Sequence, residues 1–186
     1  HRSAENIARN KWRHPVETLQ FFGIKNDMHV AEIWPGSKGW YTEVLAPYLR
    51  DNGKLTAISY DGSTGVDYFL KGEKKFREKL AANPEVYDKV ELTNLMPPKS
   101  IPELDESRAL DLVVTFRNVH NWVRNGIAEE MFKEMFEILK PGGILGLVAH
   151  RGSDEMTDKE HAATGYLAES VIISLAERNG FEFVDA

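Results

Sequence analysis

The chain contains no cysteine among its 186 residues. Thiol catalysis, cysteine-ligated zinc and disulfide bonds are therefore excluded, and neither the cytosol nor the periplasm is ruled out. Apolar runs are short, and none approaches the roughly 20 residues of a membrane-spanning helix, so no membrane span is expected. The six histidines never occur at the H-x-x-x-H or H-E-x-x-H spacing of common metal sites, so no metal site is expected.

Basic residues are in the minority. The chain has 23 lysines and arginines against 29 acidic residues, a net charge of −6, which argues against nucleic acid as a partner. A basic cluster near the N-terminus is interpreted as a solvated helix face formed by Arg2, Arg9, Lys11 and Arg13. The length is that of a single domain. We expect residues 1–24 to form a helical segment that packs on the core, and residues 25–186 to form the domain itself.

Strand and helix patterns alternate along the rest of the chain. Strands are expected at residues 30–34, 55–60, 90–95, 110–116, 144–150 and 181–184. Helices are expected at 42–49, 68–82 and 127–139, followed by a last helix that contains Leu167 and Leu175. This alternation predicts a Rossmann-like, doubly wound, mostly parallel α/β sheet with helices on both faces. Two longer loops are expected, an acidic one over residues 154–160 and one stiffened by Pro97, Pro98 and Pro102.

Four segments are expected to meet beyond the carboxyl ends of the strands, where ligands bind in such sheets. They are the turn 35–39, Asp61, residues 117–122 and residues 150–151. Gly36 and Gly39 allow a ligand to approach the backbone closely. Asp61 ends the second strand, where a carboxylate either accepts hydrogen bonds from ribose hydroxyls or caps a turn. Together these features predict a nucleoside site.

The kind of nucleoside follows from what the turn lacks. It has neither the G-x-G-x-x-G of a dinucleotide site nor the G-x-x-x-x-G-K-[ST] of a P-loop. Glu32, just ahead of the turn, would repel a pyrophosphate and attract a cationic ligand. A positively charged nucleoside cofactor is therefore favoured.

The motifs and their order resemble the class I S-adenosylmethionine-dependent methyltransferases over nearly the whole sheet. The phrases that carry this likeness are Val30-Ala-Glu-Ile-Trp-Pro-Gly, Asp61, Asp111-Leu-Val-Val-Thr and Ile138-Leu-Lys-Pro-Gly-Gly. A narrower group of predicted bacterial methyltransferases, often exported, is similar in the phrases Trp34-Pro-Gly…Gly39-Trp-Tyr-Thr-Glu and Arg117-Asn-Val-His-Asn-Trp. This likeness favours an exported or periplasmic location and leaves a cytoplasmic one open.

The resemblance implies a cofactor, its contacts and a reaction. The cofactor would be S-adenosylmethionine, with binding residues Glu32, Trp34, Pro35, Gly36, Gly39, Tyr41, Asp61, Asn94, Arg117 and Asn118. Asp61 would hold the ribose and Asn94 the adenine, unless Asn94 is only a turn residue. A small-molecule acceptor would attack the sulfonium methyl in line, with His120 and His150 as candidate catalytic bases. Each histidine is equally interpretable as a packed structural residue.

The sequence departs from the family pattern in the glycine motif and at its end. Trp34 stands at the first glycine position and Lys38 at the third. The alternative is therefore a non-catalytic protein that binds S-adenosylmethionine or a nucleoside on the same fold, and a nucleotide-dependent oxidoreductase is a third hypothesis. The family's sheet also has a seventh, antiparallel strand between the fifth and sixth, for which the sequence offers no segment. These patterns specify neither the methyl acceptor nor the oligomeric state.

Overall fold

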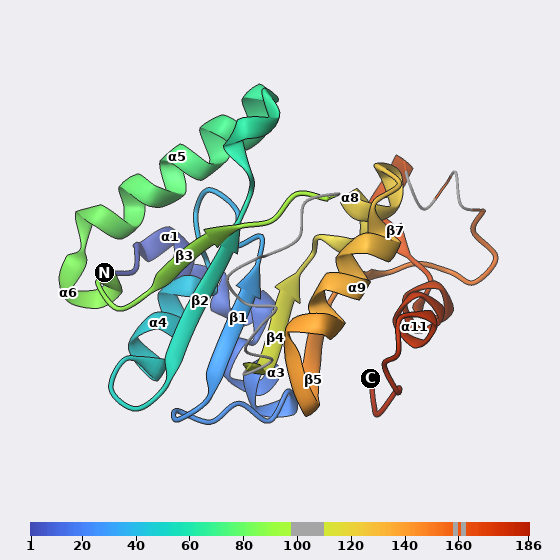
Figure 1. Ribbon diagram of the computed structural model, residues 1–186, viewed down its shortest axis with the longest axis horizontal. Helices are drawn as coiled ribbons and strands as arrows, with labels where there is room; N and C mark the ends of the chain where they lie inside the picture. Colours follow the sequence, from blue (N-terminus) through green and yellow to red (C-terminus); the bar gives the residue numbers. More distant parts are fainter. Residues whose placement is uncertain (98–109, 158–159, 161–162) are drawn as a thin grey trace.

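A five-stranded parallel sheet forms the centre of the protein (Figure 1). The computed structural model describes residues 1–97, 110–157, 160 and 163–186. The strand order is β3-β2-β1-β4-β5, with β1 (His29–Ile33), β2 (Lys54–Ser59), β3 (Glu91–Asn94), β4 (Leu110–Phe116) and β5 (Leu139–Val148). A separate parallel pair joins β6 (His150–Arg151) to β7 (Tyr166–Leu167). This architecture confirms the predicted Rossmann-like α/β class.

Helices precede the sheet and connect its strands. The short helices before β1 are α1 (Ala4–Ala8), α2 (Asn10–Arg13) and α3 (Pro15–Phe21). Between β1 and β3 lie α4 (Thr42–Leu49), the 3-10 helix η1 (Gly62–Thr64), α5 (Asp67–Ala82) and α6 (Pro84–Tyr87). The later helices are α8 (Val119–Arg124) and α9 (Ala128–Ile138), before β5, and α11 (Glu169–Arg178), after β7.

Residues that alternate along β4 separate two hydrophobic cores. Leu112 and Val114 lie in one core, together with Leu19 of α3 and Leu45 of α4. Val113, between them, lies in the other core with side chains of α9 and α11. A parallel strand that is covered on both faces is apolar at successive positions. This explains the nearly continuous apolar run that predicted β4 from the sequence.

Glu43 of α4 holds the N-terminal helices against the sheet. Its buried carboxylate accepts a hydrogen bond of 2.9 Å from the Asn6 amide, and it pairs with Arg2 at 3.2 Å and with Lys79. The Trp40 indole donates a hydrogen bond of 3.1 Å to the Asn6 carbonyl. A buried charge is tolerated only when it has such partners. These contacts place α1 beside α4, while a segment boundary at residue 24 stays a prediction.

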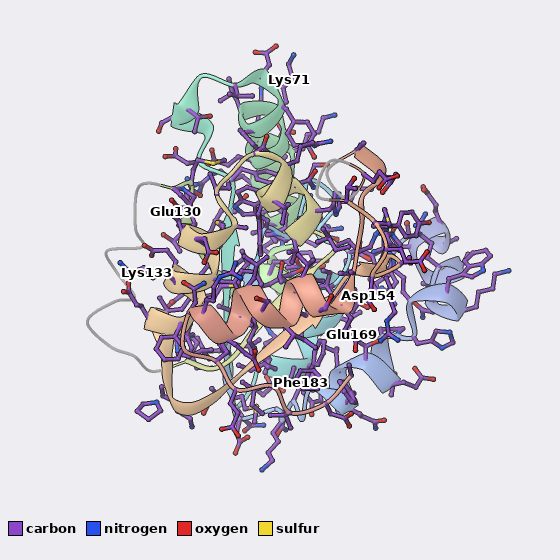
Figure 2. All side chains as sticks on the ribbon, turned by 90° about the vertical axis from the view of Figure 1, so that its right-hand side faces the viewer. Lys71, Glu130, Lys133, Asp154, Glu169 and Phe183 are labelled. Atoms are coloured by element: carbon purple, nitrogen blue, oxygen red, sulfur yellow. The ribbon has the colours of Figure 1, made fainter. Side chains whose placement is uncertain are left out.

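The predicted strand at 181–184 is wrong, because no regular structure follows α11. Gly180 takes a φ of +97° and turns the chain back, so that the Phe181 N–H donates to the Ala176 carbonyl over 3.2 Å. The Phe181 ring then packs edge-on against Phe136 of α9, with 5.2 Å between the ring centroids. Alternating apolar residues favour a strand only when neighbouring strands pack against them. Here Phe181 packs on a helix instead, and Phe183 is exposed (Figure 2).

Two predicted helix boundaries also differ. Leu139 begins β5 and does not end α9. Pro141 disfavours helical backbone at Lys140, and α9 stops at Ile138, shortly before that residue. Leu167 lies in β7, ahead of α11. Pro98, Pro102 and Asp158 of the two predicted loops lie outside the described residues. Within the described part, no helix combines the length and the hydropathy that crossing a bilayer requires.

Candidate functional site

The carboxyl ends of β1 to β4 point to one edge of the sheet, at the top of Figure 1. The helix that follows β1 packs in one hydrophobic core, and the helices that follow β4 pack in the other. In parallel sheets, ligands bind at such a switch point, in the region between the two connections that we call the crevice. The ends of β1, β2, β3 and β4 bring the turn 34–41, Asp61, Asn94 and Asn118 to this edge.

Asn118 ties the turn after β1 to the end of β4. Its buried side-chain amide donates to the carbonyls of Ile33 and Trp34 and to Thr115 Oγ1, each over 3.1 Å. These bonds explain why an asparagine suits the position without any ligand. The predicted contact between Asn118 and a cofactor stays a prediction.

The turn after β1 contains left-handed backbone at three positions. Trp34, Gly36 and Gly39 have φ values of +50°, +71° and +51°. A Cβ added at Gly36 would meet no described atom within 4 Å, whereas one at Gly39 would lie 2.6 Å from the Phe76 ring. Gly39 therefore permits close packing against α5, and Gly36 leaves space for a ligand beside the turn.

Glu32 is a fully buried carboxylate in β1, close to this turn. Its Oε2 accepts a hydrogen bond of 2.6 Å from the Thr42 hydroxyl. Burial raises the pKa of Glu32 to about 7, although the Thr42 bond acts in the opposite direction. Among the described residues Glu32 has no ion pair. A buried carboxylate of this kind gains from a nearby cation, which favours its charged form.

The Trp34 indole fills the space between the ends of several strands. Its Nε1 donates to the carbonyl of Leu95, just after β3, over 3.0 Å. Its ring packs edge-on against Tyr60 after β2 and Trp122 of α8, with centroids 5.0 and 5.8 Å away. Only 4% of the residue is exposed. The side chain at the motif's first glycine position thus lies among the segments predicted to surround a nucleoside.

Glu73 of α5 connects the ends of β2 and β3. It accepts hydrogen bonds of 2.9 Å from the Gly62 N–H and from the Asn94 amide. Burial opposes its charge, but these bonds and those from Arg77 outweigh burial and lower the pKa of Glu73. Asp61, next to Gly62, accepts a hydrogen bond of 2.8 Å from a backbone N–H of η1, as a capping residue does. Asp61 and Asn94 are therefore held on one side of the crevice.

The two candidate bases lie near Arg117. Burial and neighbouring positive charges, including Arg117, lower the pKa of both His120 and His150. Both imidazoles are therefore neutral at pH 7 and able to accept a proton. His120 lies beside Gly165, where an added Cβ would be 3.5 Å from the imidazole. The exposed His150 packs against Tyr166, with 5.3 Å between the ring centroids.

Two other basic residues near the site are already paired. Lys38, at the third glycine position, is exposed and forms an ion pair of 3.4 Å with Glu5. Arg151 pairs with Glu169, which Figure 2 labels at the start of α11. In the part of the chain that the structure describes, no three acidic or histidine side chains gather as metal ligands would.

Arg13 and Glu73 are site residues that the sequence patterns missed. The interpretation of the N-terminal basic cluster as a solvated face is wrong for Arg2, which pairs with the buried Glu43, and for Arg13, whose partly buried guanidinium lies 4.5 Å from the centroid of the Trp40 ring. Arg13 and Trp40 are far apart in the sequence, so no helical or strand periodicity indicates their contact. Glu73 precedes Arg77 by four residues, the spacing of an ordinary surface pair. That spacing gave no sign that Glu73 also bonds the ends of two strands.

Comparisons with known proteins support the fold. No family model and no curated protein matches the chain. An S-adenosylmethionine-dependent methyltransferase from Aquifex aeolicus is 19% identical with a TM-score of 0.67, over 93% of this chain and 82% of that chain. The [4+2]-cyclase SpnF is 16% identical with a TM-score of 0.66, over 93% and 58%. A possible exported protein from Bordetella parapertussis is 15% identical with a TM-score of 0.62, over 95% and 62%. The chain thus spans less than two thirds of the latter two, and at such identities the likeness shows a shared methyltransferase-type fold, not a shared activity.

Proposed function

We propose that the chain transfers a methyl group from S-adenosylmethionine to a small-molecule acceptor. The observation that carries the proposal is Glu32, a buried carboxylate with no ion pair in the described part, beside an open turn at the switch point of a methyltransferase-type sheet. A sulfonium cofactor is cationic and would compensate the charge of Glu32. A neutral nucleoside would gain nothing from this carboxylate, and a pyrophosphate would be repelled by it.

The residues of the crevice suit this cofactor at both ends. Gly36 leaves space next to Glu32 for the methionine part. Asp61 stands at the end of β2, where the ribose is expected. Two buried polar atoms nearby, Asn94 Oδ1 and Trp122 Nε1, have no hydrogen-bond partner among the described residues, and a purine offers both donors and acceptors. When bound, S-adenosylmethionine supplies an activated methyl, while the protein binds, orients and excludes water.

His120 is the proposed general base. Its lowered pKa keeps the imidazole neutral, so that it can take the proton from a hydroxyl or amine acceptor. Asn118 supports this arrangement, because its three hydrogen bonds fix the start of the helix that carries His120. His150 is the second candidate, on the more exposed side.

The Trp34 indole favours a second candidate function, that of a non-catalytic binding protein. This buried side chain packs against Tyr60, next to Asp61, and bonds the carbonyl of Leu95, next to Asn94, so a nucleoside bound at these strand ends would have to compete with it. Calorimetric titration with S-adenosylmethionine and S-adenosylhomocysteine tests both candidates. Binding of either supports the cofactor assignment, and no heat with either at millimolar concentration overturns it. Formation of S-adenosylhomocysteine in the presence of an acceptor panel separates the transferase from the binding protein.

Asp61→Ala is expected to weaken binding of S-adenosylhomocysteine by at least about tenfold, because ribose hydroxyls lose hydrogen bonds to a charged acceptor. Asp61→Asn keeps an acceptor for the η1 cap and removes the charge, so it reports on the ligand with less effect on the turn. Asp67→Ala is the matched control, since Asp67 is exposed at the start of α5 and, among the described residues, pairs only with Lys71. Wild-type affinity in both Asp61 variants would show that the ribose assignment is wrong.

A further inference from the structure

The Arg13 guanidinium forms no ion pair with any of the described residues. Its guanidinium and that of Arg2 both lie over the Trp40 ring, 4.5 and 4.8 Å from the centroid. The Nε atom of Arg13 is buried and has no hydrogen-bond partner in the described part. Burial and the charges of Arg9 and Arg117 lower its pKa. Stacking fixes the plane of a guanidinium and leaves its N–H groups available to an anion.

Arg117, directly after the end of β4, lies near enough to Arg13 for its charge to lower the pKa of Arg13. Tyr41 connects the two arginines: its hydroxyl donates to the Arg13 carbonyl over 3.0 Å, and its ring stacks on Phe116 with 3.4 Å between centroids. Arg117 follows Phe116 directly, is exposed, and has a φ of +63°. Its side chain makes no hydrogen bond or ion pair with the described residues. A non-glycine residue in this conformation costs free energy, and such residues cluster at functional sites.

Several basic groups lie close to these two arginines, and the nearby carboxylate of Glu43 is paired with Arg2 and Lys79. Arg9 lies near Arg13, while His120 and His150 lie near Arg117. The charged groups that lower the pKa values of Arg13, His120 and His150 are arginines and one histidine. The phenol of Tyr41 has the opposite effect on Arg13. The chain has a net charge of −6, yet Arg9, Arg13 and Arg117 form no ion pair with any described residue, and positive groups of this kind attract a negatively charged ligand.

We infer that Arg13 and Arg117 together bind an anionic group, a carboxylate or a phosphate, of the molecule that enters the crevice. In the proposed function, on which this assignment rests, that molecule is the methyl acceptor. Two guanidinium groups recognise the oxygens of such an anion by charge-assisted hydrogen bonds. The anion would sit beside His120, which places the nucleophilic atom of the acceptor near the proposed base. The expected substrates are small organic acids or phosphate esters, and cationic amines are disfavoured.

Titration of the whole chain with inorganic phosphate and with acetate, followed by calorimetry, tests the anion site. Arg13→Gln and Arg117→Gln should each weaken phosphate binding by about tenfold or more, because each removes a charged hydrogen-bond donor. Arg178→Gln is the matched control, since it removes the same charge at the far end of α11. Circular dichroism checks that the variants are folded. Arg117 is exposed, so its variant stays informative if loss of the Arg13 stacking loosens the N-terminal helices.

The outcomes separate the anion site from the methyl-transfer proposal. No phosphate or acetate binding by the wild type, or wild-type affinity in both variants, would overturn the site. Phosphate binding that persists with S-adenosylhomocysteine present supports the acceptor assignment. A different result would be that phosphate and S-adenosylhomocysteine compete and that Arg117→Gln binds S-adenosylhomocysteine more weakly. This would show that the arginines hold the carboxylate of the cofactor, and it would overturn the assignment of the anion to the acceptor. If S-adenosylhomocysteine does not bind at all, the proposed function fails, and the phosphate result alone decides whether the anion site stands.

Discussion

Trp34→Gly is expected to bind S-adenosylhomocysteine about a hundredfold more tightly than the wild-type chain, with a free energy of unfolding about 3–5 kcal/mol lower without ligand. The buried indole packs against Tyr60 and Trp122 and donates a hydrogen bond to the Leu95 carbonyl. A nucleoside bound as proposed, at the ends of β2 and β3, would have to displace the indole, and the free energy of that displacement would be subtracted from binding. Glycine removes this competition and suits the φ of +50° at position 34.

Two further variants make this prediction specific. Phe132→Ala also truncates a fully buried ring in the same core, but from α9, so it should destabilise the chain without tightening binding. Trp34→Phe keeps a ring and loses the bond to Leu95, so an intermediate affinity is expected. Urea unfolding and calorimetric titration give the two quantities. Weaker binding by folded Trp34→Gly would contradict the displacement and would mean that the indole stacks on the ligand.

The sheet was predictable from the sequence because its signals are local. Leu112, Val113 and Val114 are apolar at successive positions because β4 is covered on both faces. Turn residues indicate where the neighbouring strands and helices end. The segment 181–184 carries the alternating apolar pattern of a half-buried strand but does not form one. Its outcome depends on a partner, and the ring of Phe181 packs against α9 instead.

The position of the site was predictable from the sequence, but the hydrogen-bond partners of its residues were not. Topology alone places Asp61, Asn118 and the turn after β1 at one edge, because the carboxyl ends of parallel strands meet there. Bonds between distant residues decide what each side chain does. Asn118 bonds carbonyls 84 and 85 residues away, and the Trp34 indole bonds one 61 residues away. No spacing rule in a single sequence encodes these pairs, so Trp34 was identified as a departure from a motif without any indication of the space it fills.

Glu32→Gln is expected to make the chain more stable than the wild type above pH 7. The pKa of Glu32 is about 7 in the folded protein and near 4.5 when the chain is unfolded, so between these values the folded state binds the proton more tightly. Stability is therefore lost as the pH rises from about 4.5 to about 7, by about 3 kcal/mol in total. Glutamine does not titrate and still accepts the Thr42 hydrogen bond. The difference in unfolding free energy between variant and wild type, from urea titrations at pH 5 and pH 8, should change by this amount in favour of the variant.

The same carboxylate links stability to the proposed ligand. A cation beside Glu32 lowers its pKa, so binding of S-adenosylmethionine at pH 6 should release a proton in the wild type and none from this position in Glu32→Gln. Calorimetry in buffers of different ionisation enthalpy measures that release. Thr42→Val removes the hydrogen bond that favours the charged form, so it should move the pH-dependent loss of stability to higher pH. Identical pH dependence in wild type and Glu32→Gln would show that Glu32 keeps an ordinary pKa, and the electrostatic case for a sulfonium ligand at this turn would fall with it.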